Sequence, residues 1–203
     1  MADRGLTGVL LVGGASRRFG APKALARLDG ETLAERAWRL LGEACDERIA
    51  LGKAGEFELP FDVRDDGISV RAPIAGVVAG LRAAAHETAV FLPVDVPFAT
   101  PELLCRLGDA CAEAACTQTG PLPAAFAKRA LPALERRLER GELALKDALA
   151  ELETAIVEAD PAELRNVNRP EELAQAATST RSRSAPVPMI PASSPRSRST
   201  NST

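Results

Sequence analysis

The chain of 203 residues is poor in the side chains that most often carry enzymatic chemistry. It holds one histidine, His86, no tyrosine, and only 3% aromatic residues. A histidine-based zinc site or a serine–histidine–aspartate triad would depend on His86 alone, and we assign His86 no chemistry. The scarcity of aromatic rings also argues against a stacking surface for nucleic-acid bases.

Paired cysteines and long hydrophobic runs are missing as well. The four cysteines form no C-x-x-C pair, so we interpret them as small apolar residues within helices. No apolar run approaches the ~18–20 residues needed to span a bilayer, so we expect no membrane association. The first residues lack the shape of a signal peptide, and we expect a cytoplasmic protein.

The formal net charge of −3 is unevenly distributed along the chain. Residues 176–203 contain four arginines and no acid, which leaves −7 for residues 1–175. Such an acidic body argues against nucleic-acid binding, and an anionic ligand would need a local cluster of cations. Residues 176–203 are also rich in Ser, Thr and Pro. We predict a disordered tail there, because so few apolar side chains cannot offset the ordering entropy.

Short apolar runs alternate with helical patterns in residues 1–175, which we expect to form one domain. Strands are predicted at residues 6–12, 48–51, 61–64, 90–94 and 154–157. Helices are predicted at residues 33–43, 73–85, 101–115, 131–140, 145–152 and 170–175. This alternation predicts an α/β fold with a mostly parallel, doubly wound sheet. Ligands of such sheets bind at the carboxyl ends of the strands, so functional residues are expected just after Val12, Leu51, Arg64 and Val94.

A glycine-rich loop with three cations follows the first predicted strand, in the segment LLVGGASRRFGAPK. Gly13 and Gly14 allow the backbone to approach a ligand closely, and Arg17, Arg18 and Lys23 supply positive charge. The spacing matches neither G-x-x-x-x-G-K-[ST] nor G-x-G-x-x-G, and an ordinary strand-to-helix turn is the alternative. We favour phosphate binding, because glycines and cations are concentrated in one short loop of an acidic domain.

Carboxylates follow two of the later strands. Asp95 comes directly after the strand at 90–94, where it could bind Mg²⁺ together with substrate phosphates or cap a turn. Asp95 and the cationic loop are expected to meet at the same edge of the sheet, which favours Mg²⁺ binding over the capping of a turn. Asp65 and Asp66 follow the strand at 61–64. They could contact a nucleotide, although the start of a turn is the stronger interpretation from these residues alone.

Two asparagines close the folded part of the chain. Asn166 and Asn168 flank Val167, so their side chains would point to the same side of an extended segment. Both amides could then hydrogen-bond a ligand. Helix capping by Asn168 is the alternative, because a proline-initiated helix is predicted to follow.

Four segments, in order along the chain, resemble motifs of the MobA-like nucleotidyltransferase family, which includes molybdenum cofactor guanylyltransferase. The glycine-rich loop is similar to L-A-G-G-x-S-x-R-M-G-x-D-K, and APIAG at 72–76 is similar to G-P-L-A-G. Residues 93–98 match P-x-D-x-P-F, and NVNRPEEL at 166–173 is similar to N-V-N-T-P-E-D-L. The chain departs from the family at Pro22, which replaces an aspartate before Lys23.

The resemblance implies a Rossmann-like nucleotidyltransferase domain that transfers GMP from GTP to molybdenum-bound molybdopterin and releases pyrophosphate. It implies Mg²⁺ as the cofactor, bound by Asp95, with Arg18, Lys23 and Asp95 as the catalytic residues. Acceptor contacts are implied for Asn166 and Asn168. The nucleotide contacts that it implies are Leu11, Val12, Gly13, Lys23, Asp65 and Asp95.

The expected partners are GTP and a molybdopterin-type acceptor, with molybdoenzyme apoproteins or their chaperones as further candidates. Transfer of a cytidylyl group, or nucleotidyl transfer to a sugar phosphate, is an alternative that Pro22 favours and the NVNRPEEL segment opposes. A non-catalytic nucleotide-binding adaptor that docks through the Arg/Ser-rich tail is a second alternative. The joint presence of Gly14, Lys23 and Asp95 argues against it.

Overall fold

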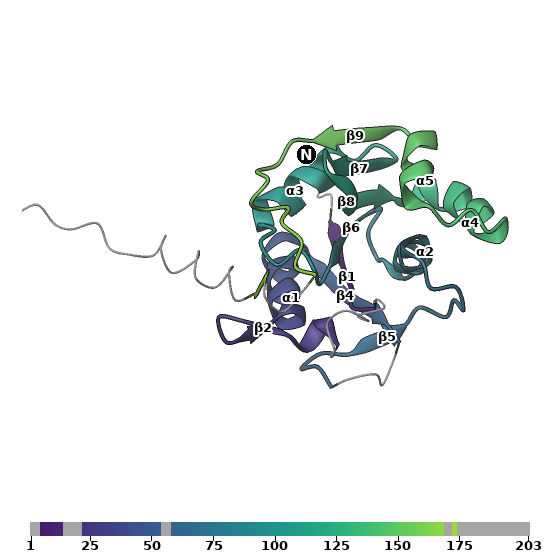
Figure 1. The fold of residues 1–203 in the computed structure, drawn as a ribbon. Helices are drawn as coiled ribbons and strands as arrows, with labels where there is room; N and C mark the ends of the chain where they lie inside the picture. Colours follow the sequence, from purple (N-terminus) through teal and green to yellow (C-terminus); the bar gives the residue numbers. More distant parts are fainter. Residues whose placement is uncertain (1–4, 14–21, 54–57, 169–171, 174–203) are drawn as a thin grey trace, which may run out of the picture.

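The computed structural model describes residues 5–13, 22–53, 58–168 and 172–173. Within these residues, one sheet has the strand order β5-β4-β1-β6-β8-β7-β9 (Figure 1). Its strands are β1 (Leu6–Leu11), β4 (Glu47–Gly52), β5 (Val63–Asp65), β6 (Thr88–Pro93), β7 (Ala114–Thr117), β8 (Gly120–Ala127) and β9 (Thr154–Val157). A small ribbon pairs β2 (Arg27–Leu28) with β3 (Glu31–Thr32). The predicted tail, Arg18 and most of the predicted helix at 170–175 lie outside the described residues.

Helices cover both faces of this sheet (Figure 1). On one face lie α1 (Leu33–Ala44) and α3 (Pro101–Ala110), and on the other lie α2 (Pro73–Ala83), α4 (Leu131–Glu139) and α5 (Leu145–Glu151). Two 3-10 helices, η1 (Lys23–Leu25) and η2 (Lys128–Ala130), lie in the connections. Each helical layer buries an apolar cluster against the sheet. No helix in the described part of the chain is both long enough and apolar enough to cross a membrane.

The sheet is mostly parallel, as the alternation of strands and helices predicts. β1 pairs in parallel with β4 and β6, β4 with β5, and β7 with β9. β8 alone runs antiparallel to its neighbours β6 and β7. The carboxyl ends of β1, β4, β5 and β6 therefore meet at one edge of the sheet, where a ligand site is expected.

The helix predicted at 101–115 is wrong in its last third. α3 ends at Ala110, and the alanine-rich segment that follows forms β7 and then β8, which was not predicted. Ala115 of β7 lies opposite Ala125 of β8, and both are fully buried. Alanine favours helices locally, but here small side chains suit strands that are covered by helices on both faces, so burial overrides propensity.

The four cysteines were predicted to lie within helices, and three of them do not. Cys105 lies within α3, whereas Cys116 lies in β7, and Cys45 and Cys111 directly follow α1 and α3. All four are free thiols. Burial raises the pKa of Cys45 to about 12 and that of Cys111 to about 11. These thiols therefore behave as apolar residues at neutral pH, which agrees with the predicted role if not the predicted element.

α2 lies close to the sheet because two of its glycines face the strands. A Cβ atom at Gly80 would clash with the ring of Phe91 in β6. A Cβ atom at Gly76 would lie 2.9 Å from Cδ2 of Leu11, the last residue of β1. The absence of side chains at these positions brings the first turn of α2 to the carboxyl edge of the sheet.

Candidate active site

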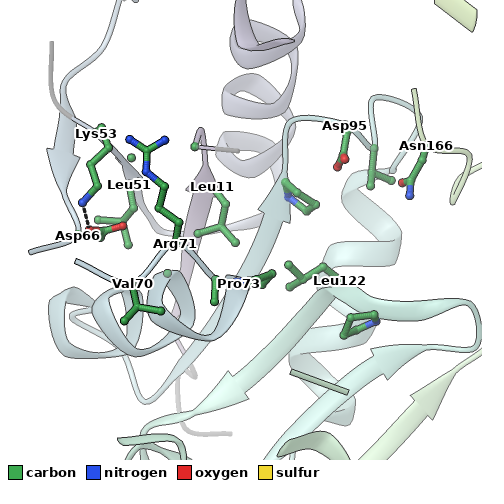
Figure 2. A pocket seen from close by; sticks show the side chains of 17 residues that line it. Leu11, Leu51, Lys53, Asp66, Val70, Arg71, Pro73, Asp95, Leu122 and Asn166 are labelled. Carbon is green, nitrogen blue, oxygen red and sulfur yellow. Dashed lines mark hydrogen bonds and ion pairs between the residues drawn. The ribbon is translucent and has the colours of Figure 1, made fainter. Parts of the chain in front are cut away.

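A cleft of about 510 Å³ opens at this carboxyl edge (Figure 2). Its volume is in the range of small-molecule sites. The strand ends contribute Leu11, Gly13, Leu51, Gly52, Lys53, Asp66, Pro93, Asp95 and Val96. The remaining lining residues come from the start of α2, the start of β8 and the C-terminal segment, and are Val70, Arg71, Ala72, Pro73, Gly76, Pro121, Leu122 and Asn166. The prediction that chemistry-bearing residues follow the strands is thus confirmed for this edge.

Lys23 and Asp95 meet at one end of the cleft. Nζ of Lys23 lies 3.4 Å from Oδ2 of Asp95, and it donates a hydrogen bond of 2.9 Å to Oδ1 of Asn168. Both charged side chains are partly buried, with exposed fractions of 15% for Lys23 and 30% for Asp95. The Asp95 carboxylate and the Asn168 amide therefore converge on the Lys23 ammonium group, and the predicted meeting of Lys23 with Asp95 is confirmed. Gly14 and Arg17 lie, like Arg18, outside the described residues.

The C-terminal segment reaches this point through a backbone contact. The amide of Val167 donates a hydrogen bond of 2.9 Å to the carbonyl oxygen of Asp95. The Val167 side chain is 1% exposed, whereas Asn166 and Asn168 are both exposed. The alternation predicted for the two asparagines is confirmed, since the valine between them packs into the core. Asn166 borders the cleft beside Asp95 (Figure 2).

A second polar group lies at the opposite end of the cleft, around Lys53 (Figure 2). Nζ of Lys53 lies 2.7 Å from Oδ1 of Asp66, 3.1 Å from the carbonyl oxygen of Ile68 and 3.5 Å from Oδ1 of Asp65. The hydrogen bond to Asp66 raises the pKa of Lys53, so Lys53 remains cationic at neutral pH. Arg71 borders the cleft at this same end.

Sequence reasoning did not select Lys53 or Arg71 for the site. The position of Lys53, directly after β4, is a signal that could have found it, because functional residues were expected just after Leu51. Nothing comparable marks Arg71, which is brought to the cleft by the start of α2. The apolar wall formed by Pro121 and Leu122 was missed because β8 itself was missed.

The predicted nucleotide contacts fall into two groups. Leu11 and Gly13 border the cleft, whereas the Val12 side chain is 4% exposed and packs into the core. The Val12 amide donates to the carbonyl oxygen of Leu51 at 2.9 Å, which fixes the backbone between Leu11 and Gly13. A nucleotide contact by Val12 would have to use its backbone, and that contact remains a prediction.

Asp65 and Asp66 begin a turn, which is the simpler of the two interpretations of this pair. Oδ1 of Asp65 accepts a hydrogen bond of 2.8 Å from the Gly67 amide, and Oδ1 of Asp66 accepts one of 3.1 Å from the Ile68 amide. Asp66, rather than Asp65, borders the cleft. The nucleotide contact of Asp65 remains a prediction, and Asp66 is the better placed of the two.

Oxygen donors suited to Mg²⁺ lie at the Lys23 end of the cleft. No group of three or more His, Cys, Asp or Glu side chains that could hold a metal ion occurs in the ranges described above. Mg²⁺ in nucleotide sites takes one or two carboxylates together with phosphate oxygens and water. The polar side chains facing the cleft at the Lys23 end are the Asp95 carboxylate and the Asn166 amide. These hard oxygen donors fit that mode of binding.

Comparison with known proteins identifies the family of this chain. Residues 8–156 match the MobA-like NTP transferase domain. A probable molybdenum cofactor guanylyltransferase from Opitutus terrae is 35% identical over 187 residues, covering 82% of this chain and 92% of the relative. A molybdenum cofactor guanylyltransferase from Acidiphilium cryptum is 40% identical over 145 residues, covering 66% of this chain and 73% of the relative.

Solved structures share the fold. Molybdopterin-guanine dinucleotide biosynthesis protein A from Archaeoglobus fulgidus superposes with a TM-score of 0.73 at 23% identity, covering 87% of this chain and 99% of that one. A 2-C-methyl-D-erythritol 4-phosphate cytidylyltransferase from Thermus thermophilus superposes with a TM-score of 0.66 at 20% identity, covering 85% and 98%. The architecture is thus that of nucleotidyltransferases. The chain belongs to the MobA-like NTP transferase family, which confirms the resemblance that its four motifs indicate.

Proposed function

We propose that the protein transfers GMP from GTP to a molybdopterin-type acceptor and releases pyrophosphate. The observation that carries the proposal is the convergence of Lys23, Asp95 and Asn168 at one end of a cleft that also has a second polar end. Transfer between two substrates is accelerated when one cleft holds both in a reactive orientation, and a cleft with two polar ends offers contacts for both. The guanylyltransferase names of the relatives support GTP as the donor and the molybdenum cofactor as the acceptor.

The proposed chemistry needs charge neutralisation and positioning more than proton transfer. A phosphate oxygen of the acceptor forms a bond to the α-phosphorus of GTP, and the bond from that phosphorus to the bridging oxygen breaks as pyrophosphate leaves. The nucleophile is already an anion, so no general base is required. This agrees with the position of His86, which precedes β6 at the amino edge of the sheet, away from the cleft.

Lys23 would neutralise phosphate charge in this reaction. GTP carries about four negative charges, and an ammonium ion bound to phosphate oxygens stabilises them both before and during transfer. In the free protein Lys23 and Asp95 neutralise each other. Binding of phosphate by Lys23 would release the Asp95 carboxylate for Mg²⁺, which when bound supplies further neutralisation of the triphosphate.

The acceptor would lie at the Asn166 side of the cleft. Asn166 offers an amide donor and acceptor there, Asn168 contacts Lys23 further along the segment, and Leu122 and Pro121 of β8 form an apolar wall. A flat ring system with polar edges, such as a pterin, suits this combination better than a polyhydroxylated sugar. The product would then pass to molybdoenzyme apoproteins or their chaperones.

Pro22 has a local backbone role that does not depend on whether the nucleotide carries guanine or cytosine. It precedes η1 with φ of −57°, and its carbonyl oxygen accepts a hydrogen bond of 3.0 Å from the Leu25 amide. Proline is pre-set for this backbone angle, so it suits the position before Lys23 on conformational grounds. The residue therefore gives little support to cytidylyl transfer over guanylyl transfer.

The test is pyrophosphate release with purified protein, Mg²⁺ and molybdenum-bound molybdopterin, with GTP, CTP or ATP as donor in parallel reactions. We expect release with GTP, dependence on both Mg²⁺ and the acceptor, and at least tenfold slower release with CTP, equivalent to about 1.4 kcal/mol. Reactions without acceptor and reactions of Asp95→Asn serve as controls. Faster release with CTP, or equal release with a sugar phosphate as acceptor, would contradict the proposal.

A further inference from the structure

Residues 158–168, which we call the strap, connect the outermost strand β9 to the Lys23 end of the cleft. The strap is fastened near its start by the Gln118 side chain, which donates to the Ala159 carbonyl oxygen at 2.7 Å and accepts from the Ala159 amide at 3.2 Å. Nη1 of Arg106 donates to the Glu158 carbonyl oxygen at 2.7 Å. Thr100, at the start of α3, donates to the Glu163 carboxylate. These contacts hold the first half of the strap against α3 and β7.

The second half of the strap contacts the loop that carries Asp95. The guanidinium of Arg165 lies over the ring of Phe98, with 4.4 Å between the guanidinium carbon and the ring centroid. Two residues further on, the Val167 amide donates to the Asp95 carbonyl oxygen. Arg165 directly precedes Asn166, so the stack and the backbone hydrogen bond lie on either side of the asparagine that borders the cleft.

The Asp95 loop is held independently of the strap. Nε of Arg36, in α1, donates to the carbonyl oxygen of Pro97 at 2.7 Å, and Val96 is almost completely buried. The loop therefore provides a fixed surface against which the strap is placed. Arg165 is exposed, so loss of its side chain would remove the stack on Phe98 without opening a cavity in the core.

We infer that Arg165 is a positioning residue, whose stacking on Phe98 sets the register of the strap on the Asp95 loop. The register matters because neighbouring side chains of an extended segment point in opposite directions. A slip of one residue would turn Val167 toward solvent and direct an asparagine into the core. A planar guanidinium on an aromatic ring restrains such slippage while remaining in contact with water. The kinetic consequence is that acceptor binding weakens more than GTP binding, because the strap carries Asn166 at the cleft and contacts Lys23 through Asn168. This consequence rests on the proposed function.

The experiment compares Arg165→Ala and Arg165→Lys with the wild type in two measurements. Hydrogen exchange of the Val167 amide reports the strap directly, and the KM values for acceptor and for GTP report its effect on the two substrates. Arg140→Ala is the matched control, an exposed arginine that follows α4.

In Arg165→Ala we expect Val167 exchange to accelerate and the acceptor KM to rise about two- to fivefold, the effect of losing one exposed cation–π contact. The GTP KM should rise less than the acceptor KM, because the strap meets Lys23 only through Asn168, and the melting temperature should not change. Lysine can also place a cation over Phe98 but lacks the planar guanidinium, so Arg165→Lys should fall between the wild type and Arg165→Ala in exchange protection and in acceptor KM. The Arg140→Ala control should match the wild type in every measurement.

Phe98→Leu supplies a double-mutant cycle. If the two side chains act through each other, Arg165→Ala combined with Phe98→Leu should be no worse than Phe98→Leu alone in acceptor KM. Unchanged Val167 exchange in Arg165→Ala would overturn the inference, as would equal rises in both KM values. Should the wild-type protein form no product from GTP and the acceptor, the proposed function fails, while the exchange measurement still decides whether Arg165 positions the strap.

Discussion

Lys23 and Asp95 are 72 positions apart in the sequence, yet the ammonium of one lies 3.4 Å from the carboxylate of the other. The contact joins the loop after β1 to the loop after β6, which are neighbouring parallel strands. The pair is partly buried, and Asp95 borders the cleft. Under the proposed function, substitution of Asp95 should lower metal-dependent turnover, and substitution of Lys23 should lower nucleotide affinity.

Asp95→Ala should abolish most of the turnover and leave the fold intact. Removing one group that stabilises developing charge typically costs ~10²–10³ in rate, and loss of the metal should cost at least that much. The main-chain carbonyl that holds Val167 remains, and the exposed fraction of the side chain limits the stability loss to below about 1 kcal/mol. Pyrophosphate release at saturating Mg²⁺ and thermal melting provide the measurements. Asp109→Ala, an exposed aspartate of α3, is the control, and near-normal turnover of Asp95→Ala would exclude Asp95 as the metal ligand.

Lys23→Ala should chiefly weaken GTP binding. A charge-assisted hydrogen bond to phosphate is worth about 1.5–3 kcal/mol, so the Kd for GTP should rise roughly 10- to 100-fold. Isothermal titration calorimetry with GTP and Mg²⁺ measures this change. The exposed Lys146 of α5 provides the matched substitution, Lys146→Ala, which should bind GTP as the wild type does. Equal affinities for Lys23→Ala and the wild type would show that Lys23 does not bind phosphate.

The partly buried thiols of Cys45 and Cys111 predict how stability changes at alkaline pH. Burial raises the pKa of Cys45 from 9.0 to about 12 and that of Cys111 from 9.0 to about 11. The neutral thiol is favoured in the folded state, so this contribution to stability is fully present below pH 9 and is lost as pH rises toward 11–12. The chain has no tyrosine, which removes one other group that titrates in this range.

Urea unfolding at several pH values between 7.5 and 11 tests this dependence on the thiols. The free energy of unfolding should decline above pH 9 in the wild type, and the decline should be shallower in Cys45→Ala. Iodoacetamide should label Cys45 and Cys111 slowly in the native protein at pH 7.5 and rapidly in urea. Rapid native labelling would contradict the burial of these thiols.

Gly80→Ala should destabilise the protein even though alanine is the better helix former. The added Cβ would clash with the Phe91 ring, and overpacking of this kind costs about 1–3 kcal/mol. Gly42→Ala in α1 is the comparison, because its new Cβ would meet the end of the exposed Arg48 side chain, which can shift at the loss of a hydrogen bond to the Trp38 carbonyl oxygen. The helix propensity of alanine offsets that loss, so this variant should stay within about 1 kcal/mol of the wild type. Urea unfolding of both variants decides the matter, and an equal effect at the two positions would contradict the role of Gly80 in the packing of α2.

The sequence allowed prediction of the parts of the site that depend on strand ends. Asp95 and Gly13 follow apolar runs that form buried parallel strands, and their meeting at one edge is a property of any such sheet. Lys53 and Asp66 also follow strand ends, but the contact between them could not be predicted in this way. It depends on the register of β4 and β5, in which Gly52 lies opposite Asp65, and short strands do not reveal their register.

Prediction also failed where burial opposes local preference. The alanines of β7 and β8 carry no strand signal, and their place in the sheet is set by the helices on both faces. The strap was predicted only at its two asparagines, because its anchors, such as Gln118 and Phe98, belong to distant parts of the chain.

Because β8 runs antiparallel to its neighbours, the two walls of the cleft differ in how well they tolerate insertions. Parallel strands place Leu11, Gly52 and Asp95 on one wall, and the spacing of those residues is fixed by crossover helices. The other wall, at Leu122, belongs to a hairpin that begins with the short turn between β7 and β8. An insertion in that turn would reshape the Leu122 wall and leave the register of β1, β4 and β6 untouched. If the acceptor binds beside Leu122 as proposed, a change in that turn would alter acceptor preference and leave the wall formed by the parallel strands as it is.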